Sequence, residues 1–238
     1  MADIVTLNEY LDLDRPNVDF LIDGLIPKPG MVLLLGEAGA GKSYMALQMA
    51  LAIAQGGTFF HAKCKRGRVL YLQLDEGELA LRYKLADLRD KHGIDISGHI
   101  YLLHPATAPK GINILQPHYF AILEDAIRKA DPDLIVFDVL REIHNADEDS
   151  STEMKPVGDA LTKLGNGRAV LILHHPKKIA YGLDPKVVDS SRASTYLPGK
   201  VDALWLLHDG YLHIGKSRFA AGGKYRVKRL KSGLWSFD

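Results

Sequence analysis

Runs of consecutive apolar residues alternate along most of the chain with longer stretches in which apolar positions recur at helical spacing. Uninterrupted apolar runs, typical of strands covered on both faces, predict strands at residues 31–35, 69–74, 134–137, 169–173 and 203–207, with a shorter strand at 99–103. Helical spacing predicts helices over residues 44–55, 79–92 and 116–130, and a further helix that ends at residue 164. Strands that alternate with helices predict a parallel sheet with right-handed crossover connections.

The pattern changes after residue 200, where strands follow one another without helices between them. Asp209-Gly210 is a hairpin turn signal, and the remaining residues predict short strands interrupted by glycines. We therefore expect an α/β fold with a mostly parallel central sheet flanked by helices and antiparallel strands at the C-terminal edge. Residues 1–27 are expected to form a lead-in segment and residues 28–238 a single domain.

Composition and charge add few constraints. The chain has 238 residues, which suits one large α/β domain, and its 30 Lys and Arg against 29 Asp and Glu give a net charge of +1, which indicates no particular partner. The single cysteine, Cys64, leaves no internal disulfide and favours a reducing compartment. His61 and Cys64 could be half of a metal site, but a surface loop is the simpler interpretation. No membrane span or signal peptide is evident, so we expect a cytoplasmic protein with no membrane partner.

Residues 36–43 read GEAGAGKS and match the phosphate-loop pattern G-x-x-x-x-G-K-[ST] at every fixed position. A predicted strand precedes the motif and a predicted helix follows it, which is the context that the motif requires. Glycines let backbone N–H groups wrap a phosphate closely, and the positive end of the helix faces the same anion. The residues expected to bind the nucleotide are Gly36, Glu37, Ala38, Gly39, Ala40, Gly41, Lys42, Ser43 and Tyr44.

Acidic side chains close two of the predicted strands. Asp138 ends an apolar run in the form of a Walker B strand, where a carboxylate can hold the Mg²⁺ that the Ser43 hydroxyl also contacts. Asp75 and Glu76 end the strand that we expect beside the phosphate-loop strand. Either carboxylate could orient and deprotonate the attacking water while the other caps the next helix, and the sequence leaves this choice open.

Basic and imidazole side chains gather in the second half of the chain. His174 and His175 end the strand after Asp138, where one of them could contact the γ-phosphate and report its loss; a structural role is the alternative. Five cations share one parity in the tail, which on strands would place them on one face; they are Lys216, Arg218, Lys224, Arg226 and Lys228. A solvated face is the alternative to a cation pair that reaches a neighbour's nucleotide. No arginine near the core strands is clearly placed to meet the charge of the transition state within one chain.

The chain resembles the RecA-like ATPase core of hexameric replicative helicases, most closely the RepA-type plasmid helicases and more distantly DnaB. The resemblance runs from about residue 20 to the end. The segments that carry it are FLIDGLIPKPGMVLLLGEAGAGKS, VLYLQLDEGE, DLIVFDVLREIH, LILHHPKK, SRAS and HIGKSRF. Only the first is specific alone, and the order and spacing of all six make the resemblance stronger.

The resemblance implies roles at the matching positions. Lys42 and Ser43 would bind phosphate and Mg²⁺, and Asp138 would be the Walker B acid. The catalytic glutamate of the family falls on Asp75, where this chain has an aspartate with Glu76 beside it.

Sensing and trans-acting residues follow from the same resemblance. His174 or His175 would be the γ-phosphate sensor, and Arg192 matches the arginine of the family's R-G-S motif with alanine in place of the glycine. Lys216 and Arg218 match a K-x-R pair that crosses the subunit boundary. The loops after Asp138 and Lys177 would contact DNA.

The leading interpretation is an oligomeric ATPase, a hexamer, that uses ATP and Mg²⁺ and moves on single-stranded DNA. One alternative is a recombination or regulatory ATPase that assembles on DNA without unwinding it. A second alternative is a P-loop small-molecule kinase, for which the long segment from residue 177 to about residue 200 would be a lid. The oligomeric mass and the ATPase rate with and without single-stranded DNA discriminate among the three.

Overall fold

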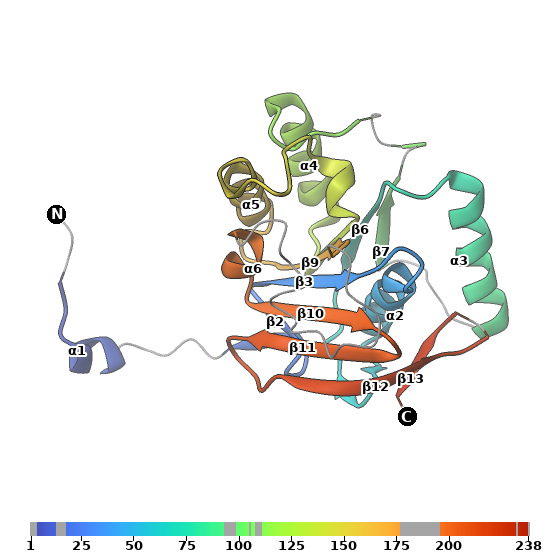
Figure 1. Cartoon of the computed structure of the whole chain (residues 1–238), viewed down its shortest axis with the longest axis horizontal. Coiled ribbons are helices and arrows are strands. Elements are labelled where there is room, and N and C mark those ends of the chain that lie inside the picture. The colour runs from blue at the N-terminus through green and yellow to red at the C-terminus, as the bar shows by residue number, and fades with distance from the viewer. Residues whose placement is uncertain are drawn as a thin grey trace.

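The structure, a computed structural model, describes residues 4–12, 18–92, 99–104, 106–107, 111–176, 196–231 and 233–237 (Figure 1). The helices are α1 (Leu7–Asp12), α2 (Lys42–Gln55), α3 (Glu78–His92), α4 (Pro117–Ala130), α5 (Ser151–Leu164) and α6 (Tyr196–Lys200), with a 3-10 turn η1 (Leu140–Ile143). The strands are β1 (Asp19–Ile22), β2 (Ile26–Lys28), β3 (Gly30–Gly36), β4 (Thr58–Phe59), β5 (Ala62–Lys63), β6 (Val69–Gln73), β7 (Ile100–Leu103), β8 (Leu134–Asp138), β9 (Ala169–His174), β10 (Ala203–His208), β11 (Tyr211–Ser217), β12 (Gly223–Arg229) and β13 (Trp235–Phe237).

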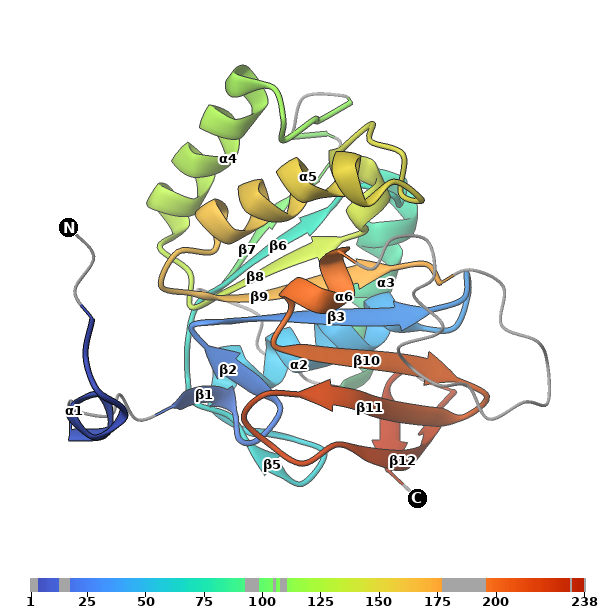
Figure 2. The same ribbon diagram turned by 60° about the vertical axis from the view of Figure 1, so that its left-hand side comes forward.

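In the described part of the chain, one large sheet has nine strands in the order β13-β12-β11-β10-β3-β9-β8-β6-β7. The six strands from β10 to β7 are parallel, and β11, β12 and β13 are antiparallel to their neighbours. Figure 2 shows β9, β3, β10 and β11 side by side. The expected α/β fold, with antiparallel strands at the C-terminal edge, is therefore confirmed.

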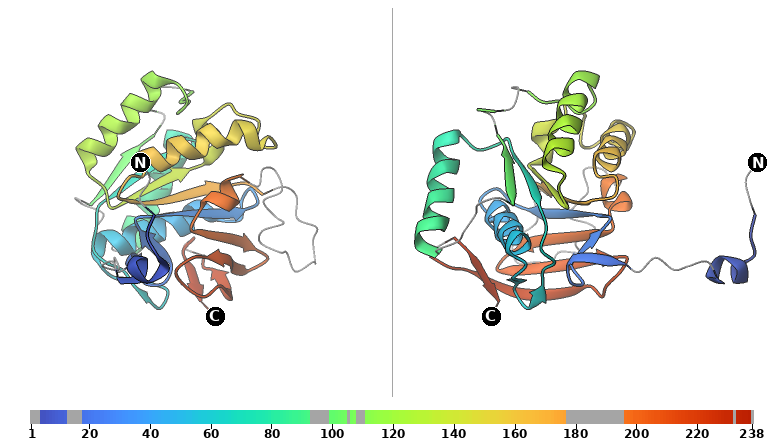
Figure 3. Two further views of the ribbon diagram at one scale, coloured as in Figure 1. Left: turned by 90° about the vertical axis from the view of Figure 1, so that its left-hand side faces the viewer. Right: turned by 180° about the vertical axis from the view of Figure 1, so that it is seen from behind.

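Helices cover both faces of this sheet. α2 and α3 pack on one face and α4, α5 and α6 on the other, as the two views of Figure 3 show. Side chains of β3 alternate between the two cores: Val32 and Leu34 lie in the first, Leu33 and Leu35 in the second. Burial on both faces explains why the parallel strands are uninterrupted apolar runs in the sequence.

The position of β6 corrects one expectation. The strand that ends just before Asp75 was expected beside the phosphate-loop strand, but β9 and β8 lie between β6 and β3. The error arose because β6 follows β3 along the chain, whereas β8 and β9, which come later in the sequence, insert between them. Register still brings the strand ends together: Leu35 pairs with His174, and Gln73 pairs with Asp138.

Within the described residues, one hairpin of the large sheet is marked in the sequence, and two small hairpins form separate sheets. Asp209 and Gly210 both have positive φ and join β10 to β11, as the hairpin signal predicted. The lead-in segment holds an antiparallel hairpin of β1 and β2 that was not foreseen. The loop at 58–67 also contains a small hairpin, β4 and β5, and Cys64 beside it is buried.

Among the described residues, no helix is long and apolar enough to cross a membrane.

Candidate active site

The phosphate loop occupies the turn between β3 and α2. Gly39 and Gly41 have φ of 77° and 94°, which side chains other than glycine rarely adopt. A Cβ added to Gly41 would lie 2.7 Å from the ring of Trp235, whose indole Nε1 donates a 3.1 Å hydrogen bond to the Gly41 carbonyl. The last strand of the sheet therefore supports the phosphate loop from behind.

A hollow of about 680 Å³ opens between this loop and the carboxyl ends of the neighbouring strands. Residues from six parts of the chain line it, among them Ser43, Asp75, Glu76, Val139 and His175. In parallel α/β sheets ligands bind at this edge. The structure thus brings together the phosphate loop and the residues after β6, β8 and β9, to which the sequence assigned roles around one nucleotide.

Lys42 folds back onto the phosphate loop. Its Nζ donates hydrogen bonds to the carbonyl oxygens of Gly36 at 2.7 Å and Glu37 at 3.0 Å, and it lies 3.3 Å from Nδ1 of His175. Burial lowers the pKa of Lys42 to about 8, against the opposing charges of Asp138 and Asp75. An anion stabilises a buried ammonium, so a phosphate at this loop would raise the pKa of Lys42.

Ser43 and Asp138 form a hydrogen-bonded pair with Tyr71 behind them. The Ser43 hydroxyl donates to Asp138 Oδ1 at 3.1 Å, and the Tyr71 hydroxyl donates to Oδ2 at 2.7 Å. Burial raises the pKa of Asp138 although both hydroxyls donate to it. A nearby divalent cation would favour the ionised form, and hydroxyl and carboxylate oxygens are the ligands that Mg²⁺ prefers. Ser43 and Asp138 therefore fit the expected Mg²⁺ position.

Asp75 and Glu76 have different surroundings. Glu76 Oε2 accepts a hydrogen bond from Lys84 Nζ at 2.6 Å, and the Glu76 backbone N–H donates to the side chain of Gln73. Asp75 acts electrostatically on Lys42 and His175, the two groups that contact each other at the phosphate loop. The carboxylate at position 76 thus already has a cationic partner, and the one at position 75 faces the loop.

The two histidines after β9 also separate. His175 lies at the phosphate loop beside Lys42 and lines the hollow. His174 faces away from the hollow, with its Nδ1 4.0 Å from Glu148 Oε1. Burial, followed by the charge of His175, lowers the pKa of His174 to about 4. Of the two candidates, only His175 is placed where it can contact a phosphate.

Lys216 and Arg218 lie near the amino ends of the parallel strands, whereas the phosphate loop lies at their carboxyl ends. Lys216 pairs in β11 with Leu204, near the start of β10, and its Nζ donates to the carbonyls of Pro198 and Gly199. Arg218 contacts Asp202 at 3.0 Å. The strand register separates Arg218 from Gly36 by about five residues, or roughly 16 Å along the strands. Neither cation reaches the nucleotide site of its own chain.

A β-bulge determines the face of the sheet on which Lys216 lies. The register shifts between Leu204 and Trp205, so Lys216 shares a face with Leu204 rather than with Leu212 and Ile214. Parity alone would place Lys216 with Leu212 and Ile214. Arg192, the remaining trans-acting candidate, lies outside the described residues, as do Lys177, Lys178 and Lys186.

Three further residues of the site were not found from the sequence. Tyr71 supports Asp138 from within β6, and Lys84 on α3 enters the hollow. Arg229, the last residue of β12, lines the same hollow with its guanidinium carbon 4.6 Å from the centre of the Tyr44 ring. Arg229 is thus an arginine at the hollow of its own chain that the sequence did not single out. No motif marks these positions, because elements distant in sequence bring them together.

The basic loop that joins α2 to β6 pairs two of its cations with acids. Lys65 contacts Asp19 in the lead-in hairpin, and Arg68 contacts Asp131 at the end of α4. These contacts attach the loop to neighbouring parts of the chain.

His61 and Cys64 of the same loop have different surroundings. The ring of His61 stacks on Phe237 with 5.4 Å between the ring centres, whereas Cys64 is buried in the core. Within the described ranges, no group of three or more His, Cys, Asp or Glu residues is arranged to hold a metal ion.

Two solved structures share this arrangement of strands and helices. One of them, the ATPase domain of another protein, superposes with a TM-score of 0.67 at 15% sequence identity, over 96% of this chain and 95% of that one. A KaiC-like protein from the hyperthermophilic archaeon Pyrococcus horikoshii superposes with a TM-score of 0.57 at 16% identity, over 92% and 93%. Fold and phosphate loop together define the class: the chain has the fold of a RecA-like P-loop ATPase.

A family model described as an AAA domain matches residues 3–180, which is more than half of the chain. The chain belongs to this family of AAA domains.

Proposed function

We propose that this protein is an oligomeric motor that hydrolyses ATP with Mg²⁺ and translocates on single-stranded DNA, of the kind represented by RepA-like replicative helicases. The observation that supports this most strongly is that the expected site residues lie at opposite ends of the parallel strands. Lys42, Ser43, Asp138 and Asp75 converge on one hollow at the carboxyl ends, whereas Lys216 and Arg218 lie near the amino ends. Cations placed near the amino ends can act on a nucleotide only when it is bound by a neighbouring chain.

The proposed chemistry assigns one task to each group. Lys42 and the loop N–H groups would bind the β- and γ-phosphates, while Ser43 and Asp138 would hold Mg²⁺, which neutralises charge on the phosphates. Asp75 would accept the proton of the attacking water, because its charge acts on Lys42 and His175 at the phosphate loop. His175 would contact the γ-phosphate from beside Lys42.

Assembly completes the site in this proposal. Arg218 of the neighbouring chain would meet the charge that develops on the γ-phosphate, with Lys216 beside it. The segment that follows His175 would contact DNA through Lys177, Lys178 and Lys186.

The test combines oligomeric mass, ATPase rate and strand separation. We expect a hexamer with MgATP, a rate that rises with single-stranded DNA, and unwinding of a tailed duplex. Replacing the three lysines by alanine should lower the slope of log affinity against log salt, since each phosphate contact on a single strand contributes about 0.7. Stimulation and assembly without unwinding would indicate the recombination or regulatory ATPase, and a monomer that phosphorylates a small molecule would refute the proposal.

A further inference from the structure

Lys84 extends from α3 into the hollow that the phosphate loop lines. Its Nζ lies 2.6 Å from Glu76 Oε2 and 4.9 Å from the centre of the Tyr44 ring, and its side chain is only 12% exposed. Burial raises the pKa of Asp138, and the charge of Lys84 is among the groups that oppose this rise. The ammonium group is therefore close enough to influence the carboxylate that is expected to hold Mg²⁺.

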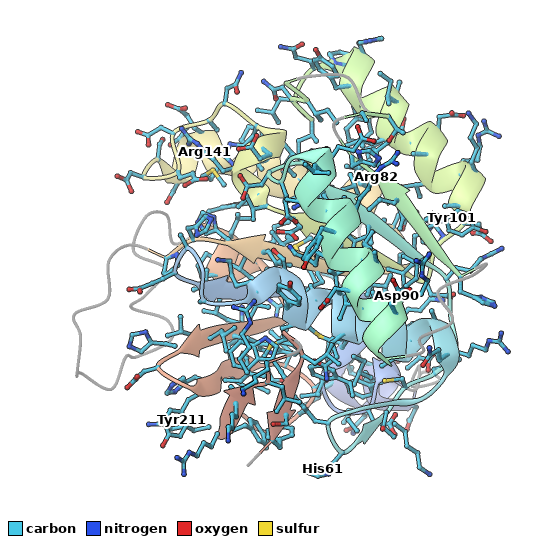
Figure 4. All side chains as sticks on the ribbon, turned by 90° about the vertical axis from the view of Figure 1, so that its right-hand side faces the viewer. His61, Arg82, Asp90, Tyr101, Arg141 and Tyr211 are labelled. Atoms are coloured by element: carbon cyan, nitrogen blue, oxygen red, sulfur yellow. The ribbon has the colours of Figure 1, made fainter. Side chains whose placement is uncertain are left out.

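The contact between Lys84 and Glu76 differs from another ion pair of the same helix. Arg82, labelled on α3 in Figure 4, pairs with Glu78 one turn away, and both side chains are well exposed. Such pairs on a helix surface contribute little to stability. Glu76 instead precedes the helix and lines the hollow, so this pair lies at the place where the phosphates of a nucleotide would enter.

We propose that Lys84 is a second phosphate-binding cation of the site, in the same chain as the phosphate loop, and that Glu76 holds it until phosphate oxygens become its partners. This inference rests on the proposed binding of ATP. A lysine suits the task because its ammonium is a compact charge with three donors on a flexible stem. Without Lys84, Glu76 would present an unpaired negative charge to the incoming phosphates.

The experiment measures binding of a fluorescent ATP analogue with Mg²⁺, together with thermal unfolding. Lys84→Met should weaken binding by about 10- to 100-fold, the range expected when a charged group loses a hydrogen bond. Lys84→Arg should recover most of the affinity, since it retains the charge. Arg82→Met, the matched control on the same helix, should change affinity by less than about twofold. If Lys84→Met fails to fold, Lys84→Gln provides the same comparison.

Glu76→Gln separates phosphate binding from a purely structural pair. If Lys84 binds phosphate, removing the competing carboxylate should tighten nucleotide binding, the opposite of the effect of Lys84→Met. If the pair only stabilises the fold, both variants should lower the unfolding temperature and weaken binding alike. Equal weakening, or wild-type affinity in folded Lys84→Met and Lys84→Gln, would overturn the inference.

Failure of the inference is distinguishable from failure of the proposed function. A wild-type protein that binds no MgATP would overturn both. Binding that is lost in Lys42→Ala but unchanged in Lys84→Met would overturn the inference alone. Binding that depends on Lys84, in a protein that neither assembles nor responds to DNA, would support the inference and refute the motor.

Discussion

Two buried histidines should make the stability of this protein depend on pH in the mildly acidic range. His144 follows η1 and has a fully buried side chain, and His174 ends β9 with a side chain 11% exposed. Glu148 Oε1 lies 3.7 Å from His144 Nε2 and 4.0 Å from His174 Nδ1. Burial lowers the pKa of each histidine to about 4. The charge of Arg141 acts in the same direction on both, and the charges of His175 and His144 do so on His174.

The direction and size of the effect follow from proton linkage. An unfolded histidine has a pKa near 6.5, so below that pH the unfolded chain binds protons that the folded chain refuses down to about pH 4. Stability is therefore present above pH 6.5 and is lost as the pH falls toward 4. Between pH 7.5 and 5.5 each histidine should cost about 1.3 kcal/mol, and the pair about 2–3 kcal/mol.

Urea unfolding at the two pH values, with wild-type protein and two variants, tests this reasoning. Asp138 and Glu148 have raised pKa values and oppose the loss, but their contributions largely cancel when variants are compared. His144→Gln should lower the pH-dependent loss by about 1.3 kcal/mol. His118→Gln, which replaces an exposed histidine on α4, should leave the loss unchanged. An equal loss in wild type and His144→Gln would show that the buried ring accepts a proton, with Glu148 as its partner, and would refute the argument.

Two further predictions concern catalysis. Asp75→Asn should retain nucleotide binding but hydrolyse ATP about 10²- to 10⁴-fold more slowly, whereas Glu76→Gln should hydrolyse it much faster than Asp75→Asn; equal, mild losses in single-turnover assays would place the base elsewhere. Arg218→Ala should lower the rate by about 10³- to 10⁵-fold if the residue acts as an arginine finger. Mixing Arg218→Ala with Lys42→Ala protein should then restore part of the activity, and mixed oligomers without recovery would exclude action in trans.

The individual strands and turns of the fold were predictable because each depends on the residues within it. Apolar runs identified the parallel strands, Gly36 and Gly41 followed by Lys42-Ser43 identified the phosphate loop, and Asp209-Gly210 identified the hairpin. The neighbours of β3 were not predictable in the same way. Chain order suggested that β6 lies beside β3. Strand order depends instead on how the crossover helices pack against both faces of the sheet. The sequence of β6 does not show that β8 and β9, which come later in the chain, lie between β6 and β3.

In the candidate site, too, features that depend on nearby residues were predictable, whereas features that depend on contacts between distant parts of the chain were not. Strand ends predicted that the residues after β6, β8 and β9 meet at the phosphate loop. Adjacent candidates could not be separated: the difference between Asp75 and Glu76 depends on Lys84, which reaches back from α3, and the difference between His174 and His175 depends on which side of β9 each leaves. The bulge in β11, which sets the face of Lys216, also arises from pairing with β10.

The charges that line the hollow indicate why the site would need the cations that lie near the amino ends of the parallel strands. Among the residues that the structure describes, three cations and three carboxylates line the hollow of one chain; they are Lys42, Lys84, Arg229, Asp75, Glu76 and, by its contact with Ser43, Asp138. These charges cancel before MgATP, which is itself negative, arrives. When Lys84 turns from Glu76 to the phosphates, its charge acts on the nucleotide directly, so a chain without a neighbour should bind the nucleotide. In the proposed motor, Lys216 and Arg218 of an adjacent chain would meet the charge that develops on the γ-phosphate during hydrolysis, because in their own chain they lie near the amino ends of the parallel strands, away from the hollow.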